Sequence, residues 1–256
     1  MSLPRDHITI KSCPFGQKNA GATYQRLVNQ MFNRQIDKNM EIYVDNMLIK
    51  SNEAKTHLED LQETFNTLRR YRMKLNPTKC VFGVLLGKFF GSMVSRRGIK
   101  ANPEKVRAIL DMTSPRTVKK AQRLIGRVAA LNKFISKATS KCLPFFKTLK
   151  QTFQWKDECE ATFQNIKEYL AKPPLLNSSI EGEDLFLYLL VSQTVVSSTL
   201  IREESKVQQL MYYTSQAFQG AEAKYPRIEK MAVSLIVASR KFRPYFQAHT
   251  IIVMTD

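Results

Sequence analysis

The chain has 256 residues, 43% of them hydrophobic, with only 9 glycines and 10 prolines. This composition excludes a disordered, collagen-like or low-complexity chain, and the length allows one large domain or two modest ones, each with a core. The formal net charge is +18, from 40 Lys and Arg against 22 Asp and Glu. Nucleic acid is the commonest partner of so basic a protein.

The excess positive charge is concentrated in residues 96–150, which carry 15 basic and two acidic side chains, whereas residues 181–256 carry 8 of each. A solvated basic face or attraction to an acidic membrane surface would also explain the charge. The longest apolar run, 185–191, is far shorter than the ~20 residues of a membrane span. The first residues have no apolar signal-peptide region, and four scattered cysteines with three histidines give little support for zinc or disulfides. We therefore expect an intracellular protein, cytoplasmic or nuclear, that is neither secreted nor inserted in a membrane.

Periodicity in the first half of the chain predicts a mixture of helices and short strands. Amphipathic patterns indicate helices over 20–36 and 51–71. Between them, two β-rich apolar runs flank Asp45–Asn46, which predicts a hairpin with its turn at that pair. Strand-like runs follow over 80–82 and 88–95.

In the second half, helices are predicted over 104–111, 118–137 and 153–170. The helix over 118–137 should bury Val118, Ala121, Ile125, Val128 and Leu131. Lys119, Arg123 and Arg127 recur every four residues and form a basic ridge on this helix, suited to a phosphate backbone or to solubility alone. Pro173–Pro174 marks the best domain boundary. Beyond it, strands over 185–191, 195–202, 210–214 and 250–254 with a helix over 222–238 indicate an α/β sheet domain.

Three short motifs occur in a fixed order: PFGQKNAGATYQ at 14–25, YVDN at 43–46, and FFGSMVS at 89–95 with Gly98–Ile99 behind it. Together they resemble the polymerase palm of gypsy-type LTR-retrotransposon reverse transcriptases, whose patterns are PFGLxNA, YxDD and a FLGxxxxxxGI primer-grip segment. The helix over 118–137 then resembles the thumb and connection of that family, and the segment from Trp155 onward its RNase H-like domain. The similarity runs over nearly the whole chain from Cys13.

The resemblance implies an α/β (α+β) fold in which a partial reverse-transcriptase palm and thumb precede an RNase H-like mixed sheet. We expect a partial palm over 1–95, a basic thumb- or connection-like helical segment over 96–150, a connecting helix with the Pro-Pro linker over 151–178, and the RNase H-like domain over 179–256, truncated at its C-terminus. The family's fingers and third metal-binding aspartate would precede Pro14, where Asp6 is the only acidic residue.

Nucleotidyl transfer in this family needs two Mg²⁺ ions, which select hard carboxylate oxygens. By resemblance, Asp45 matches the first aspartate of YxDD and is the candidate catalytic and metal residue. Asn46 replaces the second aspartate, so that the shape is kept and a charge is lost. A unit charge ~4 Å from a cation is worth ~4 kcal/mol at an effective dielectric of ~20, before desolvation. We therefore expect Mg²⁺ binding to be weak or lost; the alternative for Asp45 is the role of a turn residue.

The RNase H-like half matches the family less completely. Leu190 falls where the family has its first carboxylate, Glu229 matches the helix glutamate, and Asp256 matches the next aspartate but is the final residue of the sequence. Glu229 and Asp256 are therefore expected to be vestigial.

We expect sequence-independent contacts with phosphate. The residues assigned to nucleic acid, some of them by family analogy, are Lys18, Arg26, Gly91, Arg96, Arg97, Lys119, Arg123 and Arg127. The expected function is that of a fragment of an RNA-directed DNA polymerase and ribonuclease H, catalytically impaired or inactive. Its partner would be an RNA/DNA template–primer or hybrid, and an intact Pol copy could supply missing parts. The alternatives are a non-catalytic nucleic-acid-binding remnant and a pseudogene product without function.

Overall fold

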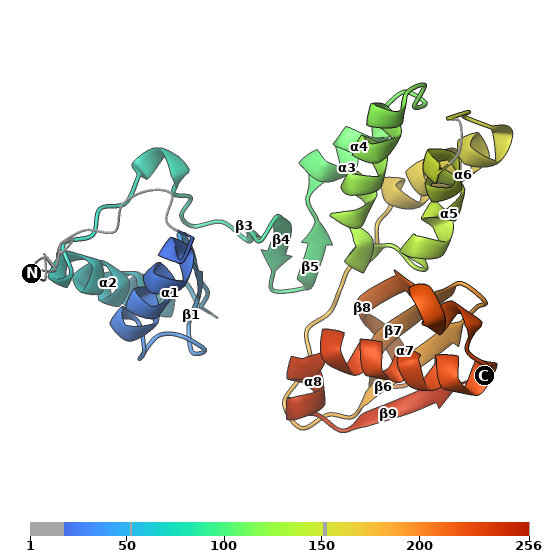
Figure 1. Cartoon of the computed structure of the whole chain (residues 1–256). Helices are drawn as coiled ribbons and strands as arrows, with labels where there is room; N and C mark the ends of the chain where they lie inside the picture. Colours follow the sequence, from blue (N-terminus) through green and yellow to red (C-terminus); the bar gives the residue numbers. More distant parts are fainter. Residues whose placement is uncertain (1–17, 52, 151–152, 256) are drawn as a thin grey trace, which may run out of the picture. The chain divides into compact units, whose positions relative to one another are not determined.

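The computed structural model describes residues 18–51, 53–150 and 153–255, with no side-chain description for Lys150. The chain divides into two compact units, one ending at Phe90 and the other beginning at Gly91. Each unit has its own buried apolar clusters. The predicted α/β (α+β) class is confirmed, since both units combine helices with sheets (Figure 1).

The first unit is built around a hairpin and two helices. Helix α1 (Ala20–Met31) is followed by strands β1 (Met40–Tyr43) and β2 (Asn46–Ile49), helix α2 (Ala54–Arg70), the short 3₁₀ helix η1 (Pro77–Lys79) and strand β3 (Leu86–Phe89). Val28, Phe32, Met40 and Leu68 are almost fully buried and join both helices to the hairpin. The hairpin is therefore fixed by packing on one side.

The second unit begins with a helical half. The hairpin of β4 (Ser92–Ser95) and β5 (Gly98–Ala101) leads into α3 (Pro103–Leu110), α4 (Val118–Ala129), η2 (Asn132–Phe134), α5 (Ala138–Lys150) and α6 (Asp157–Ala171). Asn102 caps α3 through a hydrogen bond from the Glu104 N–H, and Thr117 caps α4 through one from the Lys120 N–H. Leu124, Phe145, Phe163 and other fully buried side chains fill the core of this half.

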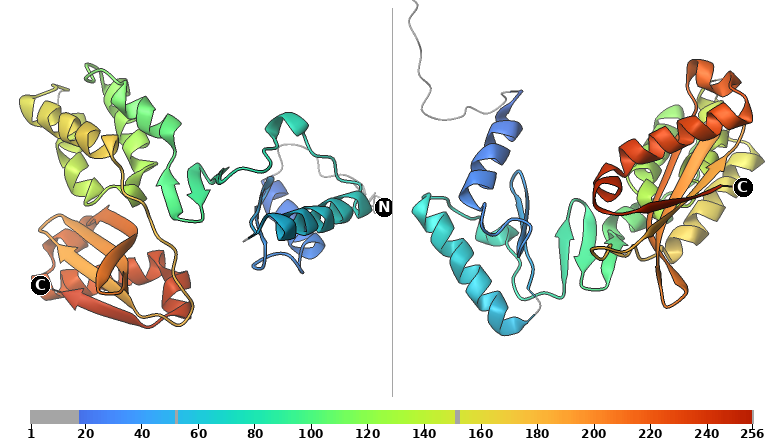
Figure 2. Two further views of the ribbon diagram at one scale, coloured as in Figure 1. Left: turned by 180° about the vertical axis from the view of Figure 1, so that it is seen from behind. Right: turned by 90° about the horizontal axis from the view of Figure 1, so that it is seen from below.

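The remainder of the second unit is a four-stranded mixed sheet in the order β8-β7-β6-β9. Its strands are β6 (Leu185–Val191), β7 (Val195–Glu204), β8 (Val207–Ala217) and β9 (Ile251–Thr255), and the connecting helices are η3 (Gly220–Lys224), α7 (Arg227–Lys241) and α8 (Arg243–Ala248). β9 runs parallel to β6, whereas the other pairs are antiparallel. Leu185, Leu187 and Leu189 of β6 form one buried cluster with Ala238 of α7 and with Phe242, which follows α7. Figure 2 shows α7 lying across one face of this sheet.

Hydrogen bonds join the helical half to the sheet within this unit. The Thr139 N–H, at the start of α5, donates to Ser215 Oγ at 3.2 Å, and Thr139 Oγ1 donates to the Ser215 carbonyl at 2.9 Å. The Asn177 N–H donates to the Leu210 carbonyl at 2.7 Å. The start of α5 and the linker after α6 are thus both attached to β8.

Several sequence predictions need correction. The helix expected over 118–137 ends at Ala129, and Val118, expected inside, is 42% exposed because it is the first residue of α4. No strand forms over 80–82, and β5, α5 and α8 were not predicted. The hairpin turn lies at Val44–Asp45, one residue earlier than expected, because Tyr43 pairs with Asn46. Among the described residues, no helix combines the length and apolar character that a bilayer span requires.

Candidate nucleic-acid and metal sites

The turn that presents Asp45 has an unusual backbone. A two-residue loop, Val44–Asp45, connects β1 and β2, and Val44 has a φ of +51°. Glycine is the usual residue at a positive φ in such hairpin turns, and a β-branched residue there is strained by roughly 1–3 kcal/mol. The surrounding structure must therefore hold Val44 in place.

The side chain of Gln25 on α1 stabilises this turn by hydrogen bonds. Its Oε1 accepts a hydrogen bond from the Val44 N–H at 2.6 Å, and its Nε2 donates to Asn29 Oδ1 at 2.8 Å and to the Ile42 carbonyl at 3.4 Å. In the sequence, Gln25 is only the last residue of the first motif. Its half-buried position on a helix that packs against the hairpin is visible only in the structure.

Asp45 and Asn46 lie side by side at the exposed end of the β1–β2 hairpin. Both residues are exposed, and Asn46 Nδ2 donates to Asp45 Oδ1 at 3.3 Å. Burial, and secondarily the charge of Asp45, raises the pKa of Tyr24. Mg²⁺ requires near-octahedral oxygen ligands, usually including one or two carboxylates. In the part of the chain that the structure describes, no three His, Cys, Asp or Glu residues gather to hold an ion.

Exposed aromatic rings lie beside this turn in the first unit. The Tyr43 and Phe90 ring centroids are 4.4 Å apart, and Phe89 and Phe90 meet edge to face at 4.7 Å. Tyr43 and Phe90 are each about half exposed, at 52% and 53%. Exposed aromatic faces are able to stack on nucleotide bases without regard to sequence.

The candidate RNase H-like residues do not form a carboxylate cluster in the described chain. Leu190 lies at the end of β6, opposite Ser197, and is 38% exposed. By alternation along the strand, it faces away from the core that β6 shares with α7. Glu229 is exposed in the first turn of α7, and Asp256 lies outside the described residues. Glu229 is thus the one candidate carboxylate of this group that the structure places.

Lys230, next to Glu229, makes a structural contact that the sequence pattern does not predict. It is only 8% exposed, and its Nζ donates to the Gln193 carbonyl at 2.9 Å, in the loop between β6 and β7. Its Nζ also lies 5.5 Å from the centre of the Phe218 ring. Lys230 therefore fixes the loop that follows Leu190.

Most of the predicted phosphate-binding residues are exposed. Arg96 and Arg97 form the tip of the β4–β5 hairpin, and Lys119 and Arg123 project from α4. Arg127 is half-buried, and its guanidinium donates to the Ala108 carbonyl in α3. Four of these five side chains are therefore open to a phosphate backbone, whereas Arg127 serves packing as well.

The other three candidates lie around the first unit and the unit boundary. Lys18 lies two residues before the start of α1, and Arg26 is exposed on α1. Gly91 has a φ of +64°, and a Cβ added there would come within 2.4 Å of Lys105 Nζ. Gly91 therefore supplies backbone geometry beside a lysine rather than a side-chain contact of its own.

Two family models together match most of the chain. The model described as reverse transcriptase (RNA-dependent DNA polymerase) matches residues 2–124, and the one described as an RNase H-like domain found in reverse transcriptase matches residues 155–253. Asp45, the exposed basic residues of α4 and the β4–β5 hairpin lie within the first match, and Leu190 and Glu229 within the second.

Similar curated proteins are transposon polyproteins. The Pol polyprotein from transposon 297 of Drosophila melanogaster is 26% identical over 258 residues, which is all of this chain and 24% of the relative. That from transposon opus is 28% identical over 95% of this chain and 26% of the relative. The transposon Tf2-7 polyprotein of Schizosaccharomyces pombe is 25% identical over 96% of this chain and 19% of its own. The chain thus spans about a quarter or less of the length of these relatives.

Solved structures with the same fold include foamy viral protease-reverse transcriptase. In complex with an RNA/DNA hybrid, that protein matches with a TM-score of 0.81 at 20% identity, over 94% of this chain and 33% of its own. Its complex with double-stranded DNA matches with a TM-score of 0.79, over 94% of this chain and 51% of that one.

Proposed function

The chain belongs to the reverse transcriptase and RNase H region of gypsy-type LTR-retrotransposon Pol polyproteins, and from this premise we propose that it binds an RNA/DNA hybrid or template–primer duplex while catalysing little or no reaction itself. The observation that carries the proposal is a surface with many cations and few metal-binding carboxylates. Residues 96–150 have a net charge of +13, and Arg96, Arg97, Lys119 and Arg123 are exposed.

Binding through these residues would be insensitive to sequence. Lys and Arg side chains neutralise phosphates and release condensed counterions, whereas contacts to phosphate carry no base information. Foamy viral protease-reverse transcriptase, which has the same fold, is solved with an RNA/DNA hybrid and with double-stranded DNA. Lys18, Arg26 and Gly91 are proposed as weaker contacts near the template or primer.

The proposed loss of catalysis rests on the ligand chemistry of the two candidate metal sites. Mg²⁺, the ion that the family resemblance implies, would find one carboxylate at Asp45 and an amide at Asn46, where the YxDD pattern of the family places two carboxylates. In the RNase H-like sheet, Leu190 offers no oxygen ligand, which leaves Glu229 without a described partner carboxylate. Because these residues do not fit a two-metal centre, no reaction step is assigned to them.

We also propose the domain assignment. Residues 1–95 would form the partial palm, 96–150 the thumb- or connection-like helical segment, 151–178 the connecting helix and linker, and 179–256 the RNase H-like domain. This division differs from the two compact units of the structure, which separate at Phe90 and Gly91.

Binding of a fluorescent RNA/DNA hybrid at increasing salt tests the proposal. Each protein–phosphate contact contributes about −0.9 to the slope of log K against log salt for a B-form duplex. We expect the double variant Lys119→Glu/Arg123→Glu to reduce the magnitude of this slope by about 2 and to weaken binding equally for hybrids of different sequence.

The matched control changes the net charge by the same amount elsewhere, with Lys206→Glu/Arg240→Glu on exposed positions of the neutral 181–256 segment. It should leave the slope close to that of the unmodified chain. Equal losses in both double variants would mean that only overall charge matters and would contradict the assignment to α4.

A further inference from the structure

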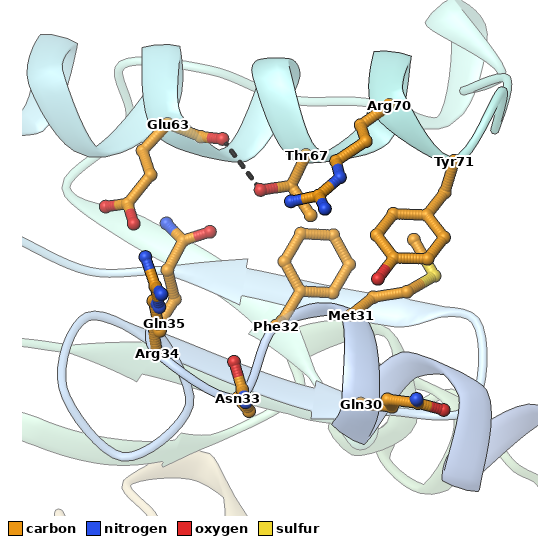
Figure 3. A pocket seen from close by; sticks show the side chains of 10 residues that line it. All are labelled: Gln30, Met31, Phe32, Asn33, Arg34, Gln35, Glu63, Thr67, Arg70 and Tyr71. Atoms are coloured by element: carbon orange, nitrogen blue, oxygen red, sulfur yellow. Dashed lines mark hydrogen bonds between the residues drawn. The ribbon is translucent and has the colours of Figure 1, made fainter.

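Separate elements are held together in different ways in the two units. In the first unit, a side chain attaches the loop after α1 to α2: Gln35 Nε2 donates to Thr64 Oγ1 at 3.1 Å. Figure 3 shows Gln35 in the wall of a cavity between the two helices. In the second unit, the backbone of the linker that follows α6, residues 172–178, pairs with two different strands. This linker therefore connects both halves of the second unit.

On one side, the linker pairs with β5. The Ile99 N–H donates to the Leu176 carbonyl at 2.7 Å, and the Leu176 N–H donates to the Ile99 carbonyl at 2.9 Å. Gly98 lies so close that an added Cβ would be 2.2 Å from the Leu176 carbonyl oxygen. A side chain at position 98 would therefore push the linker away from β5.

On the other side, the next residue of the linker pairs with β8 of the RNase H-like sheet. The Asn177 N–H donates to the Leu210 carbonyl at 2.7 Å, and Asn177 Nδ2 donates to the same oxygen at 3.2 Å. Leu176 is 1% exposed and belongs to the core of the helical half, against which Ile99 and Leu210 also pack. The linker thus fixes β5 relative to β8.

The strand that the linker holds carries one of the proposed phosphate contacts. Arg96 and Arg97 form the tip of the β4–β5 hairpin, and Gly98 follows them directly. A short hairpin is marginally stable by itself, and ordering a mobile segment during binding costs affinity. Because the linker pairs with β5 next to the tip, the tip is held in place before a ligand binds.

Given the duplex binding proposed above, on which this inference rests, we propose that Leu176 and Asn177 are positioning residues for the Arg96–Arg97 pair. They hold the hairpin tip in a fixed place relative to the RNase H-like sheet, so that the two arginines meet duplex phosphates without first being ordered. The linker contacts no phosphate itself and acts through β5. If it separated from β5, both arginines would stay on the surface and add little to affinity.

The contribution of the arginine pair to binding of a fluorescent RNA/DNA hybrid, measured in three backgrounds, tests the proposal. In the unmodified chain, Arg96→Gln/Arg97→Gln should weaken binding about tenfold. In the Gly98→Ala chain, the same two substitutions should weaken binding about twofold or less. Leu176→Ala is the matched control, because it also lowers stability by removing a buried side chain but keeps the backbone hydrogen bonds. In that background the tenfold effect should remain.

Amide hydrogen exchange gives a second readout that needs no nucleic acid. The Ile99 amide should exchange slowly in the unmodified chain and about tenfold faster in Gly98→Ala, while the amides of β6 keep their rates. Equal effects of the arginine substitutions in all three backgrounds, or fast exchange of the Ile99 amide in the unmodified chain, would overturn the proposal. An unmodified chain that binds no hybrid would contradict the proposed function, whereas the exchange rates alone decide whether the linker holds β5.

Discussion

Single residues in this chain decide local geometry through contacts made far away in the sequence. Val44 is held at a positive φ because its N–H donates a hydrogen bond to the Gln25 side chain on α1. Lys230 reaches from α7 to the loop after β6. Gly98, with a φ of +128°, lies in contact with the linker after α6, where the Ile99 N–H donates to the Leu176 carbonyl at 2.7 Å. Each residue fixes a turn or loop near a proposed site.

Gly98 gives a direct test at this scale. A Cβ there would lie 2.2 Å from the Leu176 carbonyl oxygen, and the backbone conformation disfavours any side chain. We expect Gly98→Ala to lower the free energy of unfolding by about 2 kcal/mol or more. Urea unfolding, followed by the fluorescence of Trp155, the single tryptophan, measures this change.

The control is Gly126→Ala. Gly126 lies inside α4, and an added Cβ would have nothing within 4 Å. Alanine should therefore stabilise the unit by about 0.5–1 kcal/mol, because glycine is the poorer helix former. If both substitutions changed stability in the same direction, the close contact between Gly98 and Leu176 would not be the cause.

At the scale of elements, Glu160 anchors α6 to the segment between α3 and α4. Its carboxylate accepts hydrogen bonds from Gln164 Nε2 and Trp155 Nε1, both at 2.7 Å, and from Ser114 Oγ at 2.9 Å. These bonds, with that from Gln164 the largest cause, lower the pKa of Glu160. Lys167, one turn further from Gln164, donates to the Met112 carbonyl at 2.7 Å.

The lowered pKa predicts acid sensitivity. Because the folded state favours the ionised carboxylate, its contribution is complete above the usual glutamate pKa of about 4.3 and is lost as the pH falls through the lower folded value. Glu160→Gln should therefore be less stable than the unmodified chain at pH 7, on the order of 1 kcal/mol. The difference should shrink below about pH 4.

Urea midpoints measured by Trp155 fluorescence from pH 3 to pH 7 check this expectation. Glu158→Gln, on the exposed side of the same first turn, provides the comparison and should show little pH-dependent difference. A difference for Glu160→Gln that stays constant across this range would contradict the role given to its charge.

The sequence predicted elements with strong periodicity and missed those that depend on tertiary contacts. Strand β6 was predicted with its observed bounds, because Leu185–Val191 is a continuous apolar run. Helix α5 was missed because Pro144 lies inside it and disfavours helix, while burial of Cys142 and Phe145 offsets that cost. The hairpin turn was predicted one residue too late, at Asp45–Asn46 instead of Val44–Asp45. The contact with Gln25 that holds Val44 does not appear in a local sequence pattern.

The candidate sites were predicted unevenly for the same reason. The motifs singled out Asp45 and Asn46 as candidates, and the four-residue spacing predicted a basic ridge, of which Lys119 and Arg123 are exposed. Spacing alone did not show that Arg127 donates to the Ala108 carbonyl. The roles of Gln25 and Lys230 depend on hydrogen bonds between separate elements, which a periodic sequence pattern does not encode.

On the scale of the whole molecule, we propose that a basic surface is combined with carboxylate sets that fall short of the family pattern. Its net charge of +18 favours association with nucleic acid. Asp45 and Glu229, one in each unit, are the candidate metal-binding carboxylates among the described residues. We therefore expect this chain to bind a template–primer without the chemistry on it that an active polymerase would add.

One experiment measures both properties together. A primed RNA template is incubated with the chain, Mg²⁺ and deoxynucleoside triphosphates, while fluorescence anisotropy reports binding and gel electrophoresis reports extension of the primer. We predict binding that weakens with salt, does not require Mg²⁺, and is accompanied by no extension. Extension that disappears in the Asp45→Asn variant, with binding retained, would show a working metal centre and would contradict the account.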